Sequence, residues 1–327
     1  MAGIGRIEEP YKTGIVSISR LQNAVLLINK PEGLTSFETV ARVRKLIQIK
    51  KIGHSGTLDK FASGLLVICT GWATKLTRFF LESNKEYIAV VQLGITTDTG
   101  DGEGEIIEKK SFEGITAEDF SAAAGHFKGE QMQLPPRYSA LKVKGSRASD
   151  LARNGELVEL ERRRIFIYAI EGLESDPGSG RFTIKVRCSK GTYIRSLARD
   201  IGEKLGTGAY LAELVRTQSG NFSLEQAVTL EELEQYLAGM ETEKNFTLEP
   251  AEALRDFNRI TVQSEAVPRI FNGAWFQIEE TTDIEYRDEE KKRFLIMDTE
   301  KNLIAIADVD IDKWHITYLN VFNNQLF

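Results

Sequence analysis

One acidic residue stands alone in a glycine-rich segment near the middle of the first hundred residues. Asp59 lies in KIGHSGTLDKFASGLLVICTG, residues 51–71, between a basic stretch and the apolar run LLVIC. Glycine lets a backbone approach a ligand closely, and loops held by rigid elements often carry catalytic groups. An aspartate in such a loop can also simply cap a turn. The segment alone therefore allows a catalytic carboxylate or a structural one.

Few other residues suit familiar catalytic chemistry. The three histidines are His54, His126 and His315, and the two cysteines, Cys69 and Cys188, are far apart in the sequence. Neither set has the spacing of a metal site, and three histidines offer few candidates for the base of a serine-type triad. No phosphate-binding or dinucleotide-binding glycine motif occurs. We therefore expect no metal and no cofactor, and a chemistry that relies on carboxylate, arginine and aromatic side chains.

Length and composition indicate a soluble protein of two domains. The chain has 327 residues, of which 42% are hydrophobic and 28% charged, as in globular proteins. No apolar run approaches the ~18 residues that a membrane span needs, and the first residues lack the pattern of a secretory signal. We expect a cytoplasmic protein with no membrane partner.

The net charge of −6 is carried entirely by the last part of the chain. From Pro250 onward there are nine Lys and Arg against fifteen Asp and Glu, so residues 1–249 are balanced. Within that balanced part, basic residues cluster at 42–51 and at 137–147, where they are Arg137, Lys142, Lys144 and Arg147. Such clusters can bind phosphates on an acidic protein because affinity depends on local charge. A solvated helix face is the alternative explanation.

Hydrophobic periodicity predicts the elements that would hold Asp59 and its neighbours. Strands are expected at 24–30, 85–94 and 181–188, and helices at 35–48, 115–127 and 192–206. In the first helix, Thr35 and Glu38 have the spacing of a capping box, and an apolar stripe is expected to be buried, formed by Phe37, Val40, Val43 and Ile47.

The last eighty or so residues resemble a separate unit. A polar segment at 241–250 has the composition of a linker. Four short strands are expected after it, at RITVQ, AWFQI, RFLIMD and LIAIADV. The sequence therefore predicts a first domain at 1–248 and a small β-rich domain at 249–327.

Several motifs in the first domain resemble one family. GHSGTLDKFASGLL closely resembles the central motif of the TruB family of pseudouridine synthases. Four further segments between about residues 24 and 230 match that family in the same order, namely LLINKPEGLTS, KEYIAVVQLGITTDTGDGEGE, PPRYSALKVKGSRA and CSKGTYIRSLARDIGEKLGTGAYLAELVRTQSG. Two positions depart from the pattern. Lys60 replaces the usual proline after the catalytic aspartate, and LVRT replaces Leu-Arg-Arg, which puts loop rigidity and one RNA contact in question.

The resemblance implies a fold and an activity. The fold is α/β (α+β): a catalytic domain with a mixed, largely antiparallel sheet, an RNA-binding insertion near 130–165, and a small β-rich, PUA-like C-terminal domain. The activity is isomerisation of uridine to pseudouridine in the T loop of tRNA, at position 55, after the base has been flipped out of its stack. The family also implies a monomer that works without a guide RNA.

The resemblance also assigns roles to individual residues. Asp59 is the catalytic carboxylate, and Arg195 is the neighbour that keeps it ionised. One carboxylate can suffice, although glycosidases use two, because the uracil never leaves the site. Whether Asp59 attacks C1′ or first removes a proton from C2′ stays open. The other substrate-binding residues that the resemblance implies are Lys30, which supports the pocket through Tyr87; His54, which stacks in the T loop; and the base-pocket residues Tyr87, Tyr193 and Leu214.

Two other functions remain open from the sequence. One is a guide-RNA-dependent pseudouridine synthase of the related eukaryotic and archaeal branch, whose basic tails this chain lacks. The other is a non-catalytic module that folds tRNA. The presence of Asp59, Tyr87 and Arg195 favours an active, stand-alone enzyme.

Overall fold

The computed structural model describes residues 18–139, 141–143, 146–147 and 160–323. In that part of the chain, a ten-stranded sheet runs in the order β14-β1-β3-β12-β4-β11-β10-β7, with β2 beside β3 and β13 beside β12. The strands are β1 (Val25–Lys30), β2 (Ile52–Ser55), β3 (Ser63–Thr70), β4 (Lys85–Leu93), β7 (Gly129–Gln133), β10 (Arg163–Asp176), β11 (Arg181–Cys188), β12 (Ala209–Ser219), β13 (Phe222–Ser223) and β14 (Thr247–Leu248). Its neighbouring strands are antiparallel except β3 and β12, which are parallel. The mixed, largely antiparallel sheet predicted from the sequence is confirmed.

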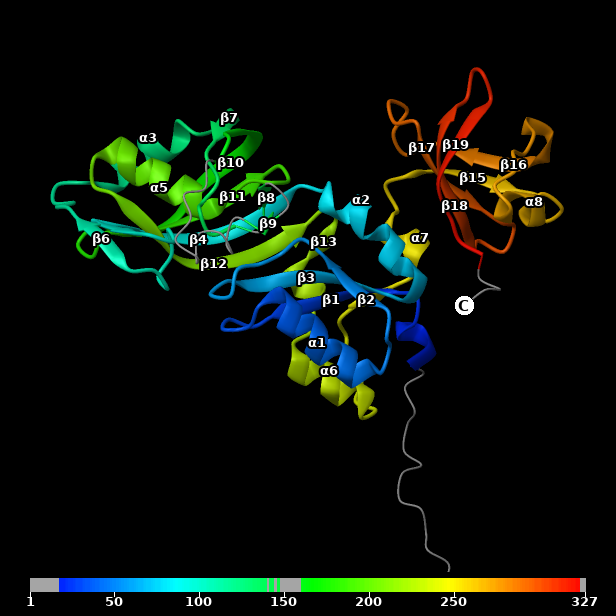
Figure 1. Cartoon of the computed structure of the whole chain (residues 1–327), viewed down its shortest axis with the longest axis horizontal. Coiled ribbons are helices and arrows are strands. Elements are labelled where there is room, and N and C mark those ends of the chain that lie inside the picture. The colour runs from blue at the N-terminus through cyan, green and yellow to red at the C-terminus, as the bar shows by residue number, and fades with distance from the viewer. Residues whose placement is uncertain (1–17, 140, 144–145, 148–159, 324–327) are drawn as a thin grey trace, which may run out of the picture.

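Helices cover this sheet at both ends (Figure 1). The helices α3 (Ala117–Gly125) and α5 (Ile194–Leu205) pack against each other; α3 also packs on β10, and α5 on β12 and β4. The helices α1 (Ser36–Ile47) and α6 (Leu230–Leu237) pack together beside β1. The short helix α2 (Thr77–Leu81) joins β3 to β4. None of the helices in the described ranges is long and apolar enough to cross a membrane.

The first helix confirms its predicted cap but not the whole of its predicted stripe. Thr35 and Glu38 form the capping box, and the apolar residues from Val40 onward are buried. Phe37, however, is 72% exposed. The buried side of the first turn is occupied by Ser36 and Thr39, which hydrogen-bond to Leu58 and to the Thr35 carbonyl, so Phe37 faces outward.

Smaller strands and hairpins complete the catalytic part. The strands β5 (Ile95–Thr97) and β6 (Ile106–Lys109) form a two-stranded sheet after β4. The loop between them, residues 98–105, includes Asp101, which forms a bridge to Leu211 in β12. A second small hairpin pairs β8 (Lys142–Val143) with β9 (Ser146–Arg147). The β5–β6 loop is therefore attached to the central strand β12.

A second sheet follows near the C-terminus. It has five strands in the order β16-β15-β17-β18-β19, built from β15 (Asn258–Val262), β16 (Thr281–Glu285), β17 (Arg293–Met297), β18 (Leu303–Asp310) and β19 (His315–Val321). The predicted strands at RITVQ, RFLIMD and LIAIADV are confirmed. The strand predicted at AWFQI is wrong. There Phe276 is buried and Trp275 exposed, as alternation predicts, but among the described residues the segment pairs with no strand.

The segment predicted to be a linker belongs to the large sheet. β14 lies within it and pairs with β1, and Phe246 is buried. The helix α7 (Pro250–Ala253) follows directly, and α8 (Val267–Phe271) packs on β18 of the second sheet. The two sheets share a core, in which the rings of Trp72 and Phe322 are 4.7 Å apart. A division at residue 248 stays a prediction, as does the PUA-like character of the second sheet.

Candidate active site

Asp59 lies in the connection between β2 and β3, and hydrogen bonds fix the backbone on both sides of it. The Leu58 amide donates to the Ser36 hydroxyl over 2.8 Å, and that hydroxyl lies 3.2 Å from the Leu58 carbonyl. The Lys60 carbonyl accepts from the Gly33 amide over 2.9 Å. The loop is therefore anchored to the start of α1 without the proline that the family usually has at position 60.

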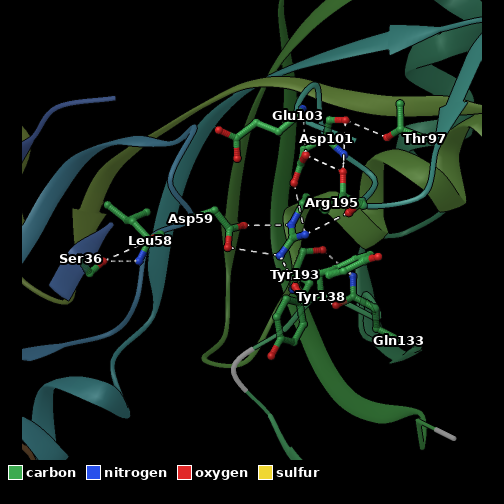
Figure 2. A network of polar contacts seen from close by, with 11 residues as sticks. Ser36, Leu58, Asp59, Thr97, Asp101, Glu103, Gln133, Tyr138, Tyr193 and Arg195 are labelled. Atoms are coloured by element: carbon green, nitrogen blue, oxygen red, sulfur yellow. Dashed lines mark hydrogen bonds and ion pairs between the residues drawn. The ribbon is translucent and has the colours of Figure 1, made fainter. Parts of the chain in front are cut away.

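The structure brings Arg195 and Asp59 together, although they are far apart in the sequence (Figure 2). Arg195 is in the first turn of α5, and its Nε lies 2.9 Å from Oδ2 of Asp59. Its Nη2 donates to Oδ1 over 3.2 Å. The side chain of Asp59 is 38% exposed, whereas that of Arg195 is 5% exposed. A buried guanidinium thus supports a carboxylate that solvent, and hence a substrate, can reach.

Arg195 is itself held by three groups on other loops. Its Nη1 donates to the Thr99 carbonyl over 3.0 Å and lies 3.3 Å from Oδ2 of Asp101. Its Nη2 also donates to the Tyr138 carbonyl over 2.8 Å. Sequence reasoning missed Asp101, which it treated as part of a turn-rich loop. The side chain of Asp101 is only 7% exposed, so one buried arginine joins two carboxylates.

The pKa of the Asp59 carboxyl is set by opposing effects. Burial raises it above the ordinary value, Arg195 lowers it, and the nearby charge of Asp101 raises it again. The net direction is upward. Arg195 therefore acts in the expected direction, favouring the ionised form, but desolvation outweighs it.

The three predicted base-pocket residues come from adjoining elements. Tyr87 in β4 packs half-buried against the core beneath α5, and burial raises the pKa of its hydroxyl. Leu214 in β12 lies opposite Ala89 of β4 and is 7% exposed. Tyr193 precedes α5, and its amide and carbonyl are hydrogen-bonded to the side chain of Gln133 over 2.9 and 3.0 Å. Figure 2 shows Tyr193 and Tyr138 beside Arg195.

Lys30 contacts backbone carbonyls next to the Asp59 loop, and these partners differ from the expected Tyr87. The side chain is fully buried, and its Nζ donates to the carbonyls of Pro31 over 2.9 Å, Leu34 over 2.5 Å and Lys60 over 3.5 Å. The expectation that it acts through Tyr87 is not what these contacts show. A buried ammonium needs several acceptors, and three carbonyls supply them. Burial lowers the pKa of Lys30 to about 8.

His54 and the first basic cluster lie on neighbouring segments. His54 is half-buried in β2, and burial lowers the pKa of its imidazole, so that the neutral ring is favoured.

The basic residues of the 42–51 cluster are exposed on α1 and the turn after it. In the 137–147 cluster, Arg137 is exposed, whereas the side chains of the other three residues lie outside those the structure describes. Among the described residues, no group of three or more His, Cys, Asp or Glu could hold a metal.

Comparison with protein families identifies the family of this chain. The model described as "TruB family pseudouridylate synthase (N terminal domain)" matches residues 44–194. The model "tRNA pseudouridylate synthase B C-terminal domain" matches residues 195–257. The chain belongs to the TruB family of pseudouridylate synthases, and it is an isomerase of that type.

Individual relatives extend the similarity over most of the chain. The tRNA pseudouridine synthase B of Clostridium tetani is 43% identical over 251 residues, which cover 77% of this chain and 84% of the relative. That of Pseudomonas syringae pv. syringae is 46% identical over 242 residues, covering 73% and 78%. Among solved structures, the archaeal box H/ACA sRNP Nop10-Cbf5 complex contains a chain that matches with a TM-score of 0.70 at 26% identity. The match covers 93% of this chain and 86% of that one.

Proposed function

We propose that this protein converts a uridine in the T loop of tRNA to pseudouridine, with Asp59 as the catalytic carboxylate. Membership of the family supports the reaction, and the relatives named tRNA pseudouridine synthase B support the substrate. The observation that carries the assignment of the catalytic residue is the contact between the accessible Asp59 carboxylate and the buried Arg195 guanidinium.

The reaction breaks the N1–C1′ bond of the uridine and forms a bond between C5 and C1′. In one route Asp59 attacks C1′, and in the other it removes a proton from C2′. Both routes need an ionised carboxylate that is fixed in place and open on one side. Arg195 donates one hydrogen bond to Oδ1 of Asp59 and forms an ion pair with Oδ2, which leaves lone pairs of the carboxylate for the substrate.

The flipped base would lie against the residues around this pair. Tyr87 and Leu214 are on adjacent strands of the sheet, and Tyr193 is next to Arg195 in the chain. Unstacked RNA bases are commonly held by aromatic faces, and an apolar side chain such as Leu214 excludes water from the other side. These residues can hold the uracil while it turns, so that C5 replaces N1 opposite C1′.

The backbone of the RNA would be bound by the exposed cations on α1. They lie on the element whose first turn contacts Leu58, directly before Asp59. The second cluster, at 137–147, spans Tyr138, whose carbonyl accepts a hydrogen bond from Arg195. A T-loop arm between these clusters would place its flipped uridine at Asp59, and binding should weaken as salt is raised.

A direct test uses purified protein and an unmodified tRNA transcript, with no cofactor and no guide RNA. Chemical mapping should show one pseudouridine, in the T loop, and a transcript with cytidine at that position should remain unmodified. Modification only after addition of a guide RNA would favour the guide-dependent alternative. Tight binding without any modification would favour a non-catalytic role and would contradict the proposal.

A further inference from the structure

Arg216 in β12 is a buried arginine for which the described part of the chain offers no ion-pair partner. It is 1% exposed and is the largest of the fully buried side chains. Among the described residues, no carboxylate forms an ion pair with it. Burying a charged group is costly unless other groups compensate for its lost hydration. Something at this position must therefore require an arginine rather than an apolar residue.

Two hydrogen bonds of Arg216 lead to the segment that carries Asp59, and a third joins its side chain to the hydroxyl of Tyr87 in β4. Its Nε donates to the Leu65 carbonyl over 2.7 Å, and its Nη2 donates to the Gly56 carbonyl over 3.3 Å. Gly56 precedes Asp59 by three residues, and Leu65 follows it by six. One guanidinium thus joins the two ends of the catalytic loop, and the two carbonyl dipoles compensate for its charge.

The backbone around Arg216 is packed so closely that it requires glycine. At Gly64, where φ is +106°, an added Cβ would lie 2.5 Å from the Arg216 carbonyl oxygen. At Gly56, an added Cβ would make only an ordinary contact, 3.5 Å from Nη1 of Arg216, and it is the φ of +88° that favours glycine there. Gly64 is also the partner of Arg216 where β3 and β12 pair in parallel, and Tyr87 is its partner in β4 on the other side.

We infer that Arg216 is a positioning residue that fixes the catalytic loop relative to β12 and β4, and so sets the place of Asp59 against Arg195 and Tyr87. The inference rests on the proposed function, because it concerns the rate of the same isomerisation. Arg216 acts through the backbone of Gly56 and Leu65 and through the hydroxyl of Tyr87, and it is not itself a catalytic residue. A displacement of about 1 Å in a reacting group can lower a rate about 10²-fold.

The test compares Arg216→Met and Arg216→Lys with Lys85→Met. Lys85 is a suitable control because it is also a buried cation, 7% exposed, and it also donates to backbone carbonyls, those of Phe80 over 3.1 Å and Leu81 over 3.0 Å. Those carbonyls lie in α2, away from the loop. For each variant, the single-turnover rate of pseudouridine formation, the dissociation constant for the tRNA transcript, and the thermal unfolding midpoint would be measured.

We expect Arg216→Met to lose about 10²-fold in single-turnover rate, while the dissociation constant for the transcript changes by less than about threefold. Arg216→Lys has one donor centre instead of a planar group, so it should recover part of the rate. Lys85→Met should lower the unfolding midpoint but keep its rate at temperatures where it is folded.

Several outcomes would overturn the inference. Among them are a folded Arg216→Met protein with the wild-type rate, and an equal loss of rate in Lys85→Met, which would show a general effect of destabilisation. If Arg216→Met does not fold, Arg216→Lys decides, since an unchanged rate there would exclude a two-carbonyl anchor. A wild-type protein that forms no pseudouridine would instead refute the proposed function.

Discussion

Arg195 joins two carboxylates, so its removal should separate an effect on stability from an effect on catalysis. Arg195→Met takes the guanidinium away from Asp59, whose side chain is 38% exposed, and from Asp101, whose side chain is 7% exposed. An unpaired buried charge typically costs about 3–5 kcal/mol. Because Asp101 is the buried partner, the free energy of unfolding should fall by about that amount. Adding Asp101→Asn removes the unpaired charge and should restore part of the loss.

The rate should not recover in the double variant. Arg195 donates one hydrogen bond to Asp59, from Nη2 to Oδ1, and makes one ion-pair contact, from Nε to Oδ2. A hydrogen bond to a charged group contributes about 1.5–3 kcal/mol and a partly exposed ion pair about 1 kcal/mol or less, so we take about 3 kcal/mol in total. If both contacts are present in the transition state, their loss lowers the rate about 10²-fold. That loss should appear equally in Arg195→Met and in Arg195→Met with Asp101→Asn.

The assay combines urea unfolding at neutral pH with single-turnover rates at saturating enzyme for the wild type, the two single variants and the double variant. A double variant with a near-wild-type rate would mean that Arg195 only neutralises Asp101. An unchanged free energy of unfolding in Arg195→Met would show that Asp101 is not the buried, dependent partner that the structure places there.

Three further predictions follow from other parts of the molecule. The rate should fall on the acid side at a pH above the ordinary carboxyl pKa of 3.8, because burial raises the pKa of Asp59 and only its ionised form acts; a pH–rate profile flat down to pH 4 would contradict this. Phe322→Ala should lower the free energy of unfolding by about 3–5 kcal/mol, since the ring is 1% exposed and packs on Trp72; urea unfolding measures it, and a change below about 1 kcal/mol would show that the two sheets do not share a core. Arg42→Glu with Lys45→Glu should weaken tRNA binding about tenfold or more and flatten its salt dependence; unchanged filter-binding curves would place the RNA elsewhere.

Much of the fold could be predicted because its periodic segments are uninterrupted. β1, β4, β11, α1, α3 and α5 each keep a regular apolar pattern, and all were found. The strands β10 and β12 were missed because bulges break their alternation, at Gly172–Glu174 in β10 and at Arg216–Gln218 in β12. A bulge adds one residue to a strand, so the alternation of inward and outward side chains shifts by one position at these points. This hid even β12, which lies at the centre of the sheet.

The site could be predicted only where the family resemblance reached it. Asp59 and Arg195 are 136 residues apart, and no periodicity relates them. Only the resemblance to the family predicted that they act together. Asp101 was not singled out, because its contact with Arg195 exists only where the β5–β6 loop meets α5 in the fold. Arg216 was noted only as part of the LVRT run, because only the fold shows that it is buried against the loop. The resemblance selected Lys30, but its carbonyl partners follow from the fold alone.

The measurement that tests the central claim most directly is pseudouridine formation by Asp59→Asn. Asparagine keeps the shape of the side chain and removes the charge, so tRNA binding should stay within about threefold of the wild type while no pseudouridine forms, even at saturating enzyme. Asp200→Asn is a matched control, because Asp200 is also paired with an arginine, Arg199, on α5, and it should retain activity. Measurable turnover by Asp59→Asn would contradict the account, since it would show that another group carries the chemistry.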